Sequence, residues 1–151
     1  MAGVFVMSDK VLSEMVNDCM ISRTRVIARV LSSVYDEVLR PYDIGSAQFA
    51  LLVAVFNLKS ASRAEIGRFT HQERSTLTRN IKLLLDGGWI EESASDEGGR
   101  RRPIVLTKTG KQLLHDVYPA WQTAQERARN LLGEGGVATV MGVGNEMFYG
   151  Q

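Results

Sequence analysis

The pattern of apolar and polar positions divides the chain into helices and one short β region. Ser8 is placed to cap a long helix that ends at Arg40-Pro41, because a residue before proline is disfavoured in the helical conformation. Apolar residues recur along it every three or four positions and form one continuous stripe. The next segment, 46–58, is apolar on nearly all sides, which predicts a buried helix.

Two helix-start signals follow in quick succession. Segments 62–65 (Ser-Arg-Ala-Glu) and 70–73 (Thr-His-Gln-Glu) both have the form of a capping box, in which a hydroxyl and a glutamate satisfy free amides reciprocally. Between them the chain has room for a helix of about two turns. The second box opens a longer helix that Gly87 and Gly88 terminate, since glycine accepts the left-handed conformation at a helix end.

Two short β-favouring runs come next, at 89–93 and 104–106, and the link 94–99 is typical of a hairpin turn. A short helix, a tight turn at 70–72, a second helix and a hairpin define a winged helix-turn-helix. The sequence therefore predicts this motif over residues 62–107.

The C-terminal third is predicted to contain a long helix followed by a weaker one. Thr107 caps a last long helix, and Pro119 inside it should introduce a kink. The tail 133–151 has apolar residues at helical spacing but many glycines, so any helix there is expected to be weak. The predicted fold class is mainly α with a small β-hairpin wing, in which long N- and C-terminal helices flank the winged helix-turn-helix.

The second helix of this motif can enter the major groove of DNA. Opposite its apolar stripe and in its first turn lie cations and hydroxyls, the candidate DNA contacts Arg74, Ser75, Thr76, Thr78, Arg79 and Lys82. An ordinary solvated helix face would also be polar. The composition favours DNA, because this face has three cations and three hydroxyls, with the acidic residues Glu73 and Asp86 only at its ends.

The charged residues are informative through their distribution along the chain and not through the net charge. The chain carries 18 Lys and Arg against 17 Asp and Glu, a net charge of +1, which by itself does not favour nucleic acid. Five basic residues and no acidic one lie between Arg100 and Lys111. Within them Arg100, Arg101 and Arg102 follow the hairpin turn, where an arginine is suited to a narrow minor groove. On charge alone, a solvated loop remains the alternative.

The remaining candidate chemistry is sparse. The single cysteine, Cys19, excludes an internal disulfide and fits a reducing cytoplasm. It is either a small core residue or a thiol sensor whose pKa Arg23, one turn away, would lower. His71 and His115 are too isolated for a metal site, so neither metal nor cofactor is expected. No catalytic motif and no membrane span is recognisable, and we expect no enzyme.

Several segments together resemble the MarR family, the multiple-antibiotic-resistance regulators, over about residues 18–132. Segments 35–41 and 48–52 are similar to the junction of the family's first two helices, 76–81 resembles its recognition helix, and Leu-Thr-Lys-Thr-Gly at 106–110 matches the pattern after its wing. The resemblance implies a homodimer whose terminal helices intertwine on a palindromic DNA operator. It also implies a cytoplasmic repressor released by a small aromatic ligand or an oxidant.

The resemblance further divides the chain by role. Residues 1–45 would form an N-terminal dimerisation helix, 46–107 the DNA-binding region and 108–151 the C-terminal dimerisation helices of one intertwined domain. The family's wing arginine falls on Arg100, and Cys19 lies about two residues from the reactive cysteine of the organic-peroxide sensors. A winged helix that binds another protein, without specific DNA binding, is the alternative function.

Overall fold

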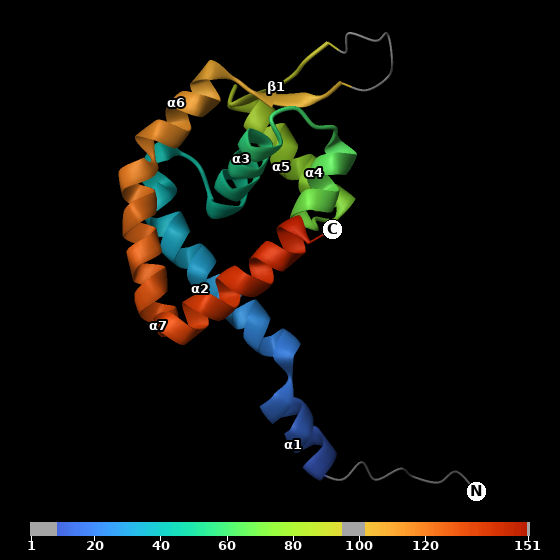
Figure 1. Ribbon diagram of the computed structural model, residues 1–151, viewed down its shortest axis with the longest axis vertical. Coiled ribbons are helices and arrows are strands. Elements are labelled where there is room, and N and C mark those ends of the chain that lie inside the picture. Colours follow the sequence, from blue (N-terminus) through green and yellow to red (C-terminus); the bar gives the residue numbers. More distant parts are fainter. Residues whose placement is uncertain (1–8, 95–101, 151) are drawn as a thin grey trace, which may run out of the picture.

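The computed structural model describes residues 9–94 and 102–150 (Figure 1). Its elements in chain order are α1 (Asp9–Asp18), α2 (Met20–Leu39), the 3-10 helix η1 (Arg40–Tyr42), α3 (Ser46–Leu58), α4 (Arg63–Thr70), α5 (Arg74–Asp86), β1 (Ile90–Glu92), β2 (Ile104–Leu106), α6 (Lys108–Asp116) and α7 (Tyr118–Tyr149). The order of helices and hairpin is the one the hydrophobic pattern predicts.

The prediction of one continuous first helix is wrong, because the helix is interrupted at Cys19. This residue is extended, with φ −71° and ψ 105°, and separates α1 from α2. The guanidinium of Arg23 donates to the carbonyl oxygens of Val16 and Cys19 at 3.2 and 3.1 Å, so it satisfies acceptors that the end of α1 leaves free. Ser8, the predicted cap, lies outside the described residues. The predicted end at Pro41 is confirmed by η1.

Helix α3 occupies the centre of the core, as its all-round apolar composition predicts. Leu51, Leu52 and Val55 are fully or almost fully buried, and α3 packs against α2, α4, α5 and β2. Two of its apolar side chains, Val53 and Phe56, remain 41% and 56% exposed. One face of this central helix is therefore open toward the C-terminal end of the chain.

The first predicted capping box is confirmed and the second is wrong. The Ser62 hydroxyl accepts from the Glu65 amide, and the Glu65 carboxylate accepts from the Ser62 amide at 2.7 Å. Thr70 instead belongs to the last turn of α4, where its hydroxyl donates to the Ile66 carbonyl at 2.8 Å and cannot cap α5. The turn is made by His71 in the left-handed conformation, φ 52°.

The hairpin forms where the sequence predicts strands. β1 and β2 pair antiparallel, with Ile90 opposite Leu106 and Glu92 opposite Ile104. Ala61, just before α4, exchanges two backbone hydrogen bonds with Ile104, which ties β2 to the start of the helix-turn-helix. The predicted turn lies outside the described residues from 95 onward. Thr107 caps α6, as predicted, by accepting from the Gly110 amide at 2.9 Å.

The C-terminal third differs from the prediction in two ways. The predicted long helix is divided into α6 and α7. Pro119 lies in the first turn of α7, where its missing N–H costs no helical hydrogen bond. The glycine-rich tail is helical to Tyr149, with a kink at Gly133, whose φ of 67° and ψ of 170° are not helical. After this kink α7 crosses back toward α4, and its earlier part runs beside α2 (Figure 1). Tertiary contacts at its end offset the weak helix propensity.

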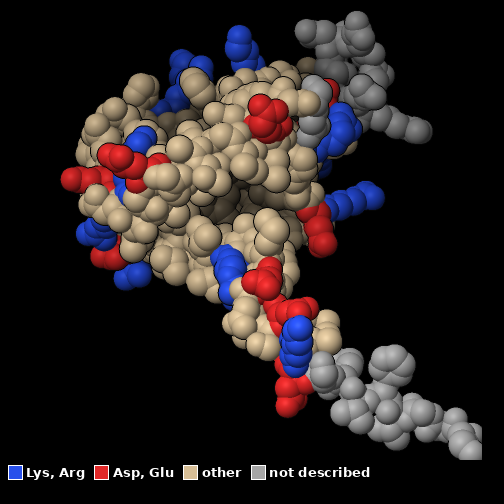
Figure 2. Space-filling model, turned by 60° about the horizontal axis from the view of Figure 1, so that its bottom comes forward, with Lys and Arg blue, Asp and Glu red and all other residues tan. Residues whose placement is uncertain are grey.

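Figure 2 shows a hollow at the centre of one face, surrounded mostly by residues other than Lys, Arg, Asp and Glu. Among the described residues, no helix combines the length and apolar character needed to cross a bilayer.

Candidate nucleic-acid interface

Helix α5 presents a polar face to solvent, opposite a buried stripe. Leu77, Ile81 and Leu84 are buried in the core. Five of the six residues predicted to contact DNA from this helix are exposed, namely Arg74, Ser75, Thr78, Arg79 and Lys82, and the sixth, Thr76, is half-buried. The sequence therefore placed the outward face correctly, because it follows directly from the helical period.

Two of these side chains already have partners on the helix. The Thr78 hydroxyl donates to the Arg74 carbonyl at 2.7 Å. The Lys82 ammonium lies 2.6 Å from the Asp86 carboxylate, with side chains 73% and 60% exposed. An exposed pair of this kind is weak, so it leaves Lys82 available to a phosphate.

The orientation of α5 is set by one buried polar contact in addition to the core. Asn80, only 4% exposed, accepts from the Gln48 side chain of α3 at 3.1 Å. The Gln48 oxygen in turn accepts from the Gly45 amide at the start of α3. Asn80 is therefore a residue that positions the helix and does not face solvent.

The N-terminus of α5 has free amide groups. Its N-cap residue is Glu73, and no side chain of the described residues caps the helix there. The first amides of a helix then point outward with the positive end of the helix dipole behind them. Such an end favours an anion such as a DNA phosphate.

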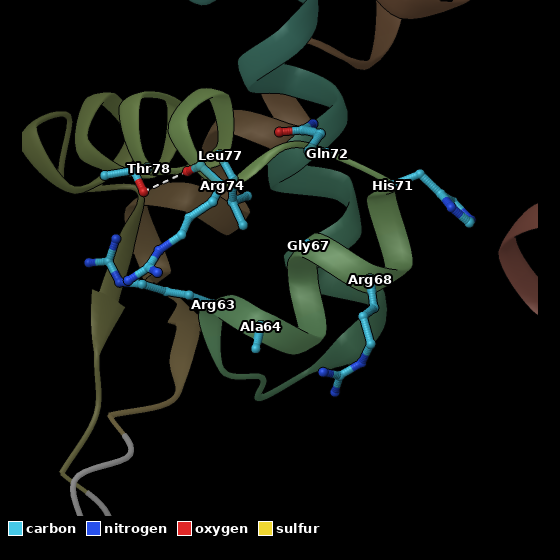
Figure 3. A pocket seen from close by; sticks show the side chains of 9 residues that line it. All are labelled: Arg63, Ala64, Gly67, Arg68, His71, Gln72, Arg74, Leu77 and Thr78. Carbon is cyan, nitrogen blue, oxygen red and sulfur yellow. Dashed lines mark hydrogen bonds between the residues drawn. The ribbon is translucent and has the colours of Figure 1, made fainter.

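A cleft of about 960 Å³ runs between α4 and α5 (Figure 3). Three arginines line it, Arg63 and Arg68 from α4 and Arg74 from α5, and its lining contains no acidic residue. In Figure 3 the side chains of Arg63 and Arg74 extend on the same side of the cleft, while that of Arg68 lies at its other end. The surface is thus more basic than α5 alone.

Sequence reasoning missed Arg63 and Arg68. Both lie on the exposed side of α4, away from the fully buried Ile66, so helical spacing could have found them. Spacing could not show that they line one cleft with Arg74, which depends on the turn at His71.

The wing is tied to the helix-turn-helix by an ion pair. The Arg63 guanidinium lies 2.6 Å from the Glu92 carboxylate of β1, with side chains 44% and 28% exposed. Of the three wing arginines predicted to contact DNA, Arg102 is described and exposed, just before β2. Arg100 and Arg101 lie outside the described residues.

Cys19 is half-buried at the α1–α2 break and is not part of the hydrophobic core. The Ser22 hydroxyl donates to its sulfur at 3.1 Å, and this bond, more than any other contact, lowers the pKa of the thiol. Arg23 contributes in the same direction but least among the causes. No group of three or more His, Cys, Asp or Glu residues in the described part of the chain is arranged to hold a metal ion.

A short helix, a left-handed turn, an exposed basic helix and a hairpin held against them define a winged helix-turn-helix protein. The sequence model described as the MarR family matches residues 42–101, which span this motif up to the wing. Over this region the chain is similar to the MarR family.

The chain is also similar to individual relatives in sequence and to solved structures in fold. The chain is 26% identical over 102 residues to an uncharacterized HTH-type transcriptional regulator, YwoH of Bacillus subtilis (strain 168). The aligned region covers 68% of this chain and 74% of YwoH. The chain is 25% identical over 91 residues to the HTH-type transcriptional regulator Hpr of Bacillus cereus (strain B4264). That aligned region covers 60% of this chain but only 49% of Hpr. The fold matches a mutant of MarR from E. coli complexed with operator DNA, with a TM-score of 0.75 at 20% identity, over 86% of this chain and 93% of that one.

Proposed function

We propose that this protein is a transcriptional regulator that binds double-stranded DNA sequence-specifically as a homodimer. The observation that carries the proposal is the continuous basic surface formed by the exposed face of α5 and the arginine-lined cleft beside it. The similarity of residues 42–101 to the MarR family and the fold shared with the E. coli MarR mutant in its operator complex support it. The proposal is of a regulator and not an enzyme, and it places the protein in the cytoplasm with its DNA.

The residues of α5 divide into two roles. Arg79 is suited to read a base, because an arginine can donate two hydrogen bonds to O6 and N7 of guanine. Lys82 and Arg68 are suited to phosphates, which they would neutralise without reading the sequence. Arg63 already has a carboxylate partner in Glu92. Ser75 and Thr76 can donate to a base or to a phosphate, and the Thr78 hydroxyl, which donates to the Arg74 carbonyl, can accept from a base. The free amides at the start of α5 can hold a phosphate.

The wing would supply the second contact. Arg102 is exposed at the base of β2, and we assign the groove contact to the segment Arg100, Arg101 and Arg102 as a whole. The ion pair between Arg63 and Glu92 supports this geometry, since it holds β1 beside α4. Helix and wing could then bind the same duplex.

Exposed apolar residues support the homodimer. α1 has no buried residue, and the apolar stripe predicted along α1 and α2 faces solvent in the single chain, including Met15, Val16, Met20, Ile21 and Val26. Further apolar side chains of α7 are exposed, among them Leu131, Val140, Met141, Val143 and Met147. A patch of this extent is unusual on a monomer and is suited to a second copy of the chain. We therefore assign dimerisation to 1–45 and 108–151, DNA binding to 46–107, and a palindromic site to the dimer.

Release of DNA by a small aromatic ligand or an oxidant is part of the proposal, with repression as the regulatory sign. Cys19 is the candidate for oxidation, supported by its lowered pKa and its position outside the core. Peroxide should release DNA from the wild type and not from Cys19→Ser. Equal release from both would leave the small ligand as the signal.

The test is filter binding to duplexes selected by the purified protein from a random library. The affinity should fall steeply with salt, because phosphate contacts release counterions. Arg79→Ala should relax the sequence preference, by about 1–3 kcal/mol at one base position. Lys82→Ala should weaken all sequences alike, and Lys10→Ala on α1 is the matched control. A salt slope near zero, or unchanged affinity in Arg79→Ala, Lys82→Ala and Arg100→Ala together, would favour a protein-interaction module instead.

A further inference from the structure

A chain of hydrogen bonds leads from α2 to α5 through the start of α3. On α2 the Asp36 carboxylate accepts from the Ser46 amide at 2.6 Å. The preceding amide, that of Gly45, donates to the side-chain oxygen Oε1 of Gln48 at 3.1 Å. The Gln48 nitrogen Nε2 then donates to Oδ1 of Asn80, on α5, at 3.1 Å. Helix α3, which packs against both α2 and α5, is thus joined to each of them by polar contacts as well (Figure 1).

The side-chain amide of Gln48 is the bridge of this chain and is held at both of its polar atoms. Its oxygen accepts and its nitrogen donates, so a rotation of the amide breaks both bonds. Asn80 is only 4% exposed, and loss of the Gln48 donor would leave its acceptor in a buried place, which is costly. The bridge therefore favours one position of α5 relative to α3.

Gly45 leaves the space in which the bridge lies. A Cβ at this position would lie 2.5 Å from Oε1 of Gln48 and 3.6 Å from Oδ1 of Asp36. The backbone of Gly45 is extended, with φ −89° and ψ 164°, a conformation that alanine adopts without strain. The nearest atom is the far end of a flexible side chain, which can move away. A side chain at position 45 would therefore displace the Gln48 amide and leave the fold intact.

The apolar contacts of α5 define its position less strictly than the bridge does. Leu77, Ile81 and Leu84 are buried in the core, but the hydrophobic effect that buries them has no preferred direction. A hydrogen bond depends on both distance and angle. Arg79 is exposed and precedes Asn80, so a rotation of α5 that breaks the bond of Asn80 also moves Arg79. Recognition of a base by two hydrogen bonds requires that such a side chain be accurately placed.

We propose that this chain of hydrogen bonds transmits the position of α2 to α5, and that Asp36, Gln48 and Asn80 are positioning residues for base recognition. Hydrogen-bond networks and rigid helices can carry energetic coupling between separate sites. Helix α2 carries part of the apolar stripe assigned to the dimer, and α5 carries the base contacts, so the chain links the geometry of the dimer to the reading of DNA. The effect on base recognition rests on the proposed function, whereas the effect on the orientation of α5 does not.

The orientation of α5 is measured on the full-length, DNA-free protein by N–H residual dipolar couplings in nuclear magnetic resonance. Gly45→Ala and the double variant Gln48→Met with Asn80→Leu should each change the couplings of α5 relative to those of α3. Gln112→Met makes the same change at an exposed glutamine of α6 and should leave them as in the wild type. Wild-type couplings in either Gly45→Ala or the double variant would overturn the positioning role.

The double variant also separates positioning from stability. Apolar groups of similar size in place of both partners are nearly neutral for stability, so the urea midpoint should stay close to that of the wild type. The preference for the selected duplex over a scrambled one should nevertheless fall at least about fivefold, the loss expected when two sites are uncoupled. A merely structural role would lower the affinity for both duplexes by the same factor. An unchanged preference would therefore overturn the role in base recognition.

Asp36 tests the other end of the chain. Asp36→Ala removes the acceptor of the Ser46 amide and should lower the preference for the selected duplex, while Asp36→Asn keeps an acceptor oxygen and should retain it. Glu37→Ala removes the neighbouring carboxylate, which lies 3.2 Å from the Arg127 guanidinium of α7, and is the control. Equal preference in Asp36→Ala and the wild type would overturn the transmission from α2. A wild type that does not distinguish the two duplexes would refute the proposed function, and the dipolar couplings would then decide the positioning role alone.

Discussion

At the residue scale, Cys19 shows how a break in a helix can change the chemistry of a side chain. In a continuous helix its thiol would belong to the apolar stripe. At the break it receives a hydrogen bond from the Ser22 hydroxyl, and backbone groups of Ser22 and Ile21 act in the same direction. These contacts stabilise the thiolate, which is the reactive form of cysteine.

We therefore predict that Cys19 is alkylated by iodoacetamide with a pH midpoint below that of free N-acetylcysteine. A lowered pKa means that the thiolate persists to lower pH. The alkylation rate of Cys19 should therefore decline at a lower pH than that of N-acetylcysteine does. Ser22→Ala should move the midpoint upward, because the largest cause of the shift is lost. Ser33→Ala, another exposed serine of α2, is the control. The same midpoint in wild type and Ser22→Ala would contradict the assigned cause.

Gly110 is a position where only glycine fits. A Cβ there would lie 2.0 Å from the Trp89 carbonyl oxygen, which is backbone and cannot move aside like a side chain. Gly110→Ala should therefore lower the free energy of unfolding by about 3 kcal/mol. Gly135, in α7, has nothing within 4 Å of its Cβ position, so Gly135→Ala should raise stability by about 1 kcal/mol. Urea denaturation followed by circular dichroism measures both, and equal effects of the two substitutions would refute this interpretation.

At the element scale, the helix-turn-helix shows that two identical capping patterns can have different outcomes. Both 62–65 and 70–73 match the capping-box pattern, yet only the first one caps a helix. The difference is that Thr70 remains in the last turn of α4, and the chain reverses at His71. The start of α5 consequently keeps its amides free for an anion.

This difference predicts unequal effects of removing the two hydroxyls. Ser62→Ala should reduce the free energy of unfolding by about 1 kcal/mol, because the cap of α4 is lost. Thr70→Val, which keeps the shape of the side chain, should change it by less than about 0.5 kcal/mol. Denaturant titration gives both values, and exchange of the Glu65 amide should quicken in Ser62→Ala only. A larger loss in Thr70→Val would mean that Thr70 does cap α5.

At the scale of the whole molecule, the structure of one chain leaves many apolar side chains of its terminal helices exposed. The exposed apolar residues of α1, α2 and α7 are stabilised only when another surface covers them. Folding and association with such a surface should therefore be coupled.

We predict that the melting temperature rises with protein concentration. Ile21→Glu, in the exposed apolar stripe of α2, should shift the protein toward monomer in sedimentation-velocity experiments and lower its melting temperature. Ser32→Glu adds the same charge at an exposed polar position of the same helix and should leave the dimer intact. A melting temperature independent of concentration over a hundredfold range, with Ile21→Glu behaving as Ser32→Glu does, would exclude the proposed interface.

The amino-acid sequence by itself determined the features that depend on neighbours within about four residues. These include the order of the elements, the caps at Ser62 and Thr107, the strands, and the outward face of α5. Local hydrogen bonds and helical period decide such features, so a single sequence is enough to predict them. The wing contacts assigned to Arg100 and Arg101, outside the described residues, stay predictions.

Only the tertiary structure decided the features that join distant segments. The cleft that Arg63 and Arg68 line together with Arg74 has no local signature, and neither has the return of α7 onto Phe69. Each depends on how helices pack in three dimensions, and packing can override propensity, as the helical but glycine-rich end of α7 demonstrates. The basic cleft and the contact between the end of α7 and α4 both arise at this level.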